Sequence, residues 1–159
     1  IVYEAEVNPY APLAATGNIV NTATITGGGI TPIEVTETVG TDNEPLLNIT
    51  KSISPVPVTE NGTLTYTFLI QNTGNTAADA ATAAEIIDTF DPILSNIAVS
   101  YNGTALVAGT DYTYNETTGL FATTAGRITV PAAAYTQDPA TGNWIVTPGT
   151  GTLTVTGTI

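Results

Sequence analysis

The stretch "LLNITKSISPVPVTENGTLTYTFLIQNTG" (residues 46–74) holds two strand patterns joined by a turn-rich connection. In residues 46–53, apolar and polar side chains alternate, and a strand places alternate side chains on opposite faces. Residues 63–74 form the strongest strand pattern in the chain, because threonine, aromatic and branched aliphatic residues favour strands. We therefore expect residue 46 to open a β-rich folding unit.

Short strand patterns recur on both sides of this stretch at a spacing of about ten residues, which is typical of a β-sandwich. Asn102-Gly103 is a strong signal for a two-residue hairpin turn, and residues 75–85 are expected to be a loop despite their alanines. The sequence predicts an all-β, Ig-like antiparallel β-sandwich with an N-terminal strand segment outside the main unit, and no helix of normal length. The expected strands and hairpins cover residues 1–7, 18–26, 30–39, 46–53, 63–74, 83–90, 95–107, 111–123, 126–131, 143–148 and 151–159.

The chain divides into three parts. Residues 1–39 are interpreted as the closing strands of a preceding repeat or as a donor-strand segment, residues 40–45 as a linker, and residues 46–159 as the sandwich repeat. The strand pair in 18–39 looks like the closing part of a sandwich, yet it precedes the unit, and no equivalent segment follows the last strand. The chain begins without methionine, so we expect a mature product or a fragment cut from something longer.

The charge of the chain excludes some partners. Its 159 residues carry fourteen carboxylates and only two cations, Lys51 and Arg127, which gives a formal net charge of −12. Such a charge repels nucleic-acid phosphates and anionic lipid headgroups. No apolar run approaches the roughly 20 residues that span a bilayer. We therefore expect neither nucleic-acid binding nor membrane insertion.

Motifs for metal binding and turnover catalysis are missing from the sequence. The chain has no cysteine and no histidine. The carboxylate pairs Asp42/Glu44 and Asp88/Asp91 do not match the spacing of a calcium loop and are interpreted as solvated surface charge. There is no phosphate loop, catalytic triad or zinc motif. We expect no metal, no cofactor and no enzyme activity.

Three expected strands each place one polar group among inward-facing apolar residues. Lys51, the only lysine, falls in register with the apolar positions of residues 46–53, and Asp88 does the same in "AAEIIDTF" (83–90). In "NIVNTATI" (18–25), Asn21 is in register with the apolar positions. The candidate donor-strand face is Ile19, Asn21, Ala23 and Ile25.

The chain resembles the Ig-like repeat called "domain of unknown function eleven", which occurs in tandem in bacterial, often clostridial, surface proteins. The shared segments are "ITK" (49–51), "GTLTYTFLIQNTGN" (62–75), "IIDTFDP" (86–92) and "VNTATIT" (20–26). Such repeats are also similar in layout to the pilus and adhesin sandwiches that form internal isopeptide bonds. That resemblance implies Lys51 as nucleophile, Asp88 as helper and Asn21 as acceptor, although here the asparagine precedes the lysine.

Chemistry leaves three interpretations of Lys51 open. It can form a buried ion pair with Asp88, extend toward water near a strand end, or form a bond to an asparagine within or between chains. Burial favours the neutral forms of an amine and a carboxyl group, and a neutral amine can attack a carboxamide carbon. The alternative for Asn21 is that its side chain caps neighbouring backbone at a strand end.

The position of residues 18–39 ahead of the unit raises the question of assembly. These residues can fold back onto their own unit or insert into the next molecule, and insertion is heterologous and builds a fibre; a lost upstream repeat is a third explanation. The short linker favours insertion. We expect a head-to-tail structural subunit of an extracellular filament or stalk on a cell or spore surface. The alternative is an adhesin that binds a host protein or glycan through loops such as 101–120. A separate expectation concerns Trp144, near Tyr135, which is expected in the core and not on a sugar-binding surface.

Overall fold

The computed structural model describes residues 2, 4, 18–40 and 42–159, and these residues are mainly strands and turns. Apart from positions 2 and 4, the expected strand over 1–7 lies outside the described residues, as does the side chain of Ile19. The described part has one helical element, the 3₁₀ turn η1 (Ala80–Thr82). The strands are β1 (Asn18–Gly27), β2 (Ile30–Gly40), β3 (Leu47–Ser54), β4 (Thr63–Asn72), β5 (Ile87–Thr89), β6 (Ser95–Tyr101), β7 (Thr104–Ala105), β8 (Tyr112–Tyr114), β9 (Leu120–Thr123), β10 (Ala134–Gln137), β11 (Trp144–Thr147) and β12 (Gly149–Thr158).

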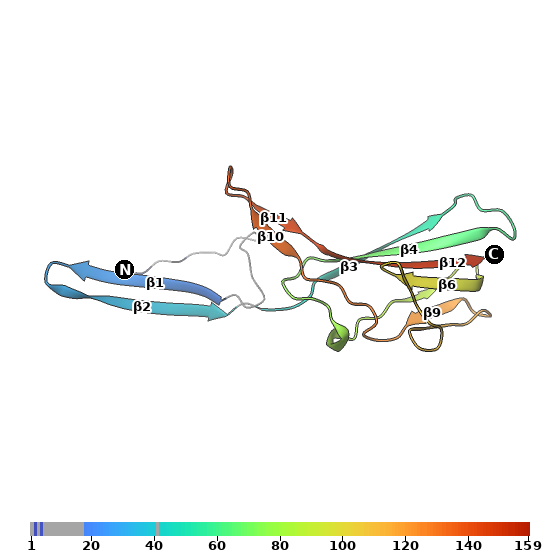
Figure 1. The fold of residues 1–159 in the computed structure, drawn as a ribbon, viewed down its shortest axis with the longest axis horizontal. Helices are drawn as coiled ribbons and strands as arrows, with labels where there is room; N and C mark the ends of the chain where they lie inside the picture. The colour runs from blue at the N-terminus through green and yellow to red at the C-terminus, as the bar shows by residue number, and fades with distance from the viewer. Residues whose placement is uncertain (1, 3, 5–17, 41) are drawn as a thin grey trace.

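Two antiparallel sheets form the main body of the molecule (Figure 1). The larger sheet has five strands in the order β3-β4-β12-β6-β7, and the smaller has three in the order β5-β9-β8. In the larger sheet, the central strands β4 and β12 pair along their whole lengths, from Asn72 with Gly149 to Thr63 with Thr158. The predicted all-β, sandwich-like fold is confirmed.

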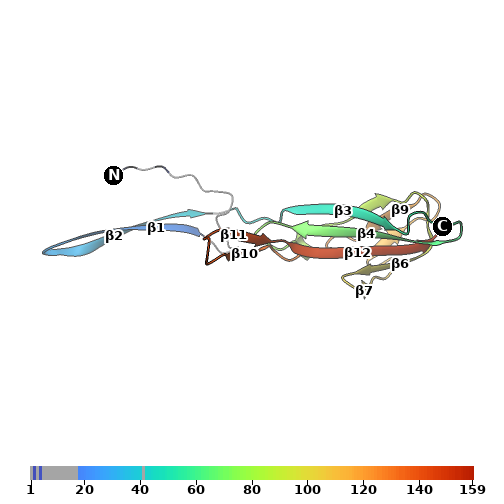
Figure 2. The same cartoon turned by 90° about the horizontal axis from the view of Figure 1, so that it is seen from above.

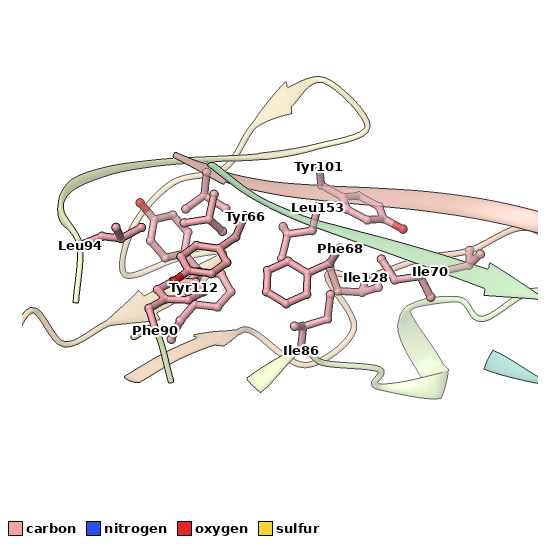
Figure 3. Packing of buried hydrophobic residues seen from close by; sticks show 14 of the residues in the cluster. Tyr66, Phe68, Ile70, Ile86, Phe90, Leu94, Tyr101, Tyr112, Ile128 and Leu153 are labelled. Carbon is pink, nitrogen blue, oxygen red and sulfur yellow. The ribbon is translucent and has the colours of Figure 1, made fainter. Parts of the chain in front are cut away.

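The core lies between these sheets (Figure 3) and follows the alternation along β4. Phe90 stands near its centre, with 4.6 Å between its ring centroid and that of Tyr66, and 5.4 Å to that of Phe121. Aromatic stacking of this kind adds to the free energy gained by apolar burial. The inward side chains of β4, which are 1–3% exposed, are Leu64, Tyr66, Phe68 and Ile70.

Strands β1 and β2 form a separate antiparallel hairpin, here called the N-terminal hairpin (residues 18–40). Figures 1 and 2 both show it projecting from one end of the sandwich. The only substantial contacts of β1 and β2 within the described residues are with each other. An isolated two-stranded hairpin is marginally stable in water, so this arrangement requires an explanation.

The N-terminal hairpin has two different faces. On one face, apolar residues are interrupted only by the cross-strand pair Asn21 and Glu37. The other face is rich in threonine, and the hydroxyls of Thr22 and Thr36 lie 3.1 Å apart in a hydrogen bond. The described apolar residues of the first face are all exposed: Ala23, Ile25, Ile33, Val35 and Val39.

Most predicted strands are present. In the predicted turn, Asn102 and Gly103 have φ values of 48° and 79°, the left-handed conformation that a type I′ hairpin turn requires. The loop predicted over 75–85 contains η1, whose start is capped by Asp79: its carboxylate accepts from the backbone N–H groups of Ala81 and Thr82.

Three predictions about strands were wrong or incomplete. Residues 126–131 form no strand; Val130 makes a single bridge to Ala78, because the segment crosses the core with Ile128 and Val130 buried. The strand expected over 83–90 shortens to β5. Strand β10 was not predicted; it pairs with β11 in a two-stranded hairpin. Trp144, expected in the core, lies on β11 outside the core cluster, because no second sheet covers this hairpin.

A fully buried asparagine ties the sandwich together at the end that carries the hairpin. The Asn72 side-chain oxygen accepts from the backbone N–H groups of Leu46 (3.0 Å) and Gly74 (2.9 Å). Its amide nitrogen donates to the carbonyls of Thr76 (2.8 Å) and Pro131 (3.0 Å). All of its hydrogen-bonding capacity is thereby used.

We expect Asn72→Ala to lower the free energy of unfolding by on the order of 3 kcal/mol, because it leaves several buried backbone groups without partners. Denaturant unfolding followed by circular dichroism measures this change. The matched control is Asn48→Ala on exposed β3, which should stay within about 0.5 kcal/mol of the parent. Equal effects of the two substitutions would contradict the role given to Asn72.

Candidate crosslinking site

One side of the sandwich is open. β3 and β5 are edge strands of different sheets, and each has a single hydrogen-bonded neighbour. Their side chains meet in the ion pair of Lys51 with Asp88, so both free edges lie on the same side of the molecule. We call this region, with the hollow between the two edges, the open side.

The inward residues of β3 are poorly covered. Lys51 pairs in register with Phe68 of β4, so the two share the inward face. The apolar residues on that face of β3 are 41–48% exposed: Leu47, Ile49 and Ile53. Beside them lies a hollow of about 140 Å³, lined mainly by Leu47, Ile49, Ile70, Ala84, Ile86 and Ile128. The smaller sheet therefore does not extend across the inner face of β3.

Lys51 and Asp88 both point inward, as their alternation predicted. The Lys51 ammonium lies over the ring of Tyr66, 4.5 Å from its centroid, with the rings of Phe68 and Phe90 at 5.6 and 5.5 Å. It also contacts an Asp88 carboxylate oxygen, while the other oxygen accepts from the backbone N–H of Thr89 at 2.9 Å. The Asp88 carboxylate and the aromatic faces attract the Lys51 ammonium and hold it in this position.

The sequence left open whether Lys51 is buried with Asp88 or extends toward water, and the structure shows a pair that is only partly buried. The Lys51 and Asp88 side chains are 37% and 22% exposed, because nothing in the described chain covers the open side above them. Within the single chain, the structure shows the ion-pair interpretation of Lys51. An exposed pair of this kind adds little to stability.

The structure brings together only two of the three candidate residues. Asn21 lies within β1, in register with Glu37 of β2, on the projecting N-terminal hairpin rather than beside Lys51. It is not at a strand end, where the capping interpretation placed it. On that hairpin, Asn21 belongs to the same face as Ala23 and Ile25, as predicted.

The linker that follows the hairpin is held against the sandwich through Asn75 and Gly74, two residues that were not singled out from the sequence. Asn75 accepts from the Glu44 N–H at 3.3 Å and donates to the Asn43 side chain at 2.9 Å and the Asp42 carbonyl at 3.3 Å. A Cβ on Gly74 would lie 2.2 Å from the Glu44 carbonyl oxygen, so only glycine permits this close approach. A polar cluster directly after a long strand was the available signal.

The other cation of the chain is also paired. The Arg127 guanidinium contacts the Asp111 carboxylate, and the second Asp111 oxygen accepts from the Val107 N–H at 2.8 Å. This arrangement fixes the loop between β7 and β8. It was not predicted, because the two residues belong to separate loops.

The remaining candidate positions show no metal centre. In the described ranges, no group of three or more acidic, histidine or cysteine side chains is placed to hold a metal ion.

Tyr135 donates its hydroxyl to the Thr73 carbonyl at 2.9 Å, which attaches the β10–β11 hairpin to the sandwich. A broad hollow near the other end is lined by Asn96, Ile97 and residues from 108 to 116.

Comparisons with protein-family models, curated proteins and solved structures found no match to this chain. No helix of the described part is long and apolar enough to cross a membrane.

Proposed function

We propose that this protein is a structural subunit of a bacterial extracellular filament or surface stalk, on a cell or spore surface, and that it assembles head to tail. The N-terminal hairpin of one copy docks on the open side of the next. The observation that carries this proposal is that one chain has both an exposed apolar hairpin face and an uncovered apolar side of its sandwich.

Both surfaces are unfavourable in a separate molecule. Exposed apolar faces cost free energy in proportion to their area, and unpaired strand edges invite the addition of another strand. Docking between copies removes both from water. Because the donor and acceptor surfaces differ, the contact is heterologous and repeats along a fibre.

Docking also offers a covalent lock between Lys51 and Asn21. The Lys51 ammonium gives a proton to the Asp88 carboxylate, and the neutral Nζ attacks Cγ of Asn21 in the neighbouring copy. A new N–C bond forms, the amide nitrogen leaves as ammonia, and the proton on Asp88 passes to it. Overall, an ammonium and a carboxamide become a secondary amide and an ammonium ion, in a single event without turnover.

A second candidate function is an adhesin module for a host protein or glycan. The hollow lined by Asn96 and residues between 108 and 116 supports it, since this region falls in the loops expected to bind a ligand. The partly exposed Tyr114 offers aromatic surface there, and the exposed Glu116 offers a charge. An adhesin should remain monomeric when pure.

The size of the purified chain tests the first proposal against the second. We expect light scattering to give polymers, and intact mass under denaturing conditions to give a ladder of chain multiples, each lighter by one ammonia per junction. Native polymers that separate into unmodified 16.3 kDa chains would support assembly without the covalent lock. A native monomer would contradict the filament, and a single chain lighter by one ammonia would show a bond within the chain.

A further inference from the structure

The two sheets of the sandwich are unequal, and the difference equals the size of the hairpin. The larger sheet has five strands and the smaller has three, while the N-terminal hairpin has two. The uncovered part of the larger sheet is β3, whose inward apolar residues face no strand of the smaller sheet. Strands added beside β5 would extend the smaller sheet across the inner face of β3.

We propose that the hairpin of a second copy adds through β1 to the free edge of β5, so that both β1 and β2 enter and the smaller sheet becomes five-stranded. This inference rests on the proposed function, in which the partner is another copy of this chain. The resulting sheet has the order β8-β9-β5-β1-β2 and matches the larger sheet in width. The apolar face of the hairpin then covers β3.

The free edge of β3 is the competing acceptor, and it fits less well. Addition there would give seven strands opposite three, and the inward residues of β3 would stay exposed. The hairpin's own apolar face would also lie opposite no sheet. Because burial of apolar area drives docking, the β5 edge is the favoured acceptor.

The polar residues fix a register. If β1 runs antiparallel to β5 with Asn21 beside Asp88, then Ala23 lies beside Ile86, and Ile25 reaches the hollow at Ala84. Asn21, the polar residue of β1 on the apolar face, then lies beside Asp88 of β5, across from Lys51, with its cross-strand partner Glu37 on β2. The reverse direction would leave that hollow without the described apolar residues near the hairpin tip.

The same register excludes the chain's own hairpin. Ala84 and Ile86 lie near Leu47 and Ile49, and Asp88 lies near Lys51, so β5 and β3 run in the same direction. β2 follows that direction, which places its last residue, Gly40, near the end of β3. The chain would have to return about 23 Å to Leu47, at 3.3 Å per strand residue.

Almost no chain is available for this return. Residues 42–46 are already bound near the start of β3 by Asn72 and Asn75, which leaves one residue between them and Gly40. When the hairpin docks on a neighbouring copy, the chain does not have to return to Leu47 of the acceptor, because it continues from Gly40 into its own sandwich beyond the end of the acceptor. Figures 1 and 2 show the hairpin projecting along the long axis, as a linear fibre needs.

Cysteine pairs distinguish the two edges, and the cysteine-free chain provides a clean background. With Asn21 beside Asp88, Thr22 on the outer face lies beside Ile87, close enough for a disulfide. With Asn21 beside Lys51 on β3, Thr22 would lie beside Thr50 or Ser52. The variants are Thr22→Cys with Ile87→Cys, with Thr50→Cys or with Ser52→Cys, each carrying Asn21→Ala so that the only covalent link is reducible.

We expect the Thr22→Cys/Ile87→Cys chain to give a disulfide-linked ladder on a non-reducing gel, which reduction collapses to the single chain, and the other two variants to give none. A ladder from a β3 pair, or light-scattering polymers without a link to position 87, would overturn the β5 assignment and leave the filament intact. Monomers for the unsubstituted chain and all variants would overturn both proposals.

Discussion

Mixing the Lys51→Ala chain with the Asn21→Ala chain should produce a covalent dimer that neither chain forms alone. Each bond consumes one Lys51 and one Asn21, so each single variant lacks one of the two reacting groups. In the mixture, the Lys51→Ala chain still donates Asn21, and the Asn21→Ala chain still offers Lys51. The product stops at two chains, because no reactive pair remains at either end.

Intact mass under denaturing conditions measures the outcome, with a dimer lighter by one ammonia as the expected species. The control is Asn18→Ala, on the same strand as Asn21 but on its opposite face, which should form the full ladder unmixed. A mixture that yields only unlinked chains, while the parent chain is crosslinked, would show that the bond forms within one chain. A ladder from Lys51→Ala alone would remove Lys51 from the chemistry.

Local patterns were sufficient for much of the fold. The alternation along β4 identified a core strand, Asn102-Gly103 identified a turn, and the inward direction of Lys51 and Asp88 followed from their neighbours. These features depend on residues close together in the chain, and alternation sets which face is buried. They also revealed the two faces of the N-terminal hairpin.

Features set by distant contacts could not be predicted in the same way. Residues 126–131 look like a strand, yet no neighbouring strand is available to pair with more than Val130. Trp144 is a large aromatic residue of the kind that often lies in a core, but the β10–β11 hairpin that carries it lies outside the two sheets of the sandwich. The partial exposure of Lys51 depends on the width of the smaller sheet, which is a property of the whole topology.

Val35→Asp should convert the polymer into monomers, whereas Thr36→Asp should leave the polymer intact. Val35 lies on the apolar face of the N-terminal hairpin, in register with Ala23, and is exposed in the single chain. Docking would take the new carboxylate out of water without a cationic partner, at a cost of several kcal/mol. Since about 1.4 kcal/mol is a tenfold change in affinity, docking should weaken by at least about a hundredfold.

Thr36→Asp is a close control, because the adjacent residue lies on the outer face of the same strand. Each new carboxylate also stands two residues from a glutamate on its own face, Glu37 for Val35 and Glu34 for Thr36, so like-charge repulsion is matched. Light scattering measures the assembly, and circular dichroism should show a folded sandwich in both variants, since the hairpin does not pack on the sandwich of its own chain. Equal loss of assembly in both variants would point to repulsion by added charge, and unaffected assembly in both would mean that the apolar face remains outside the contact.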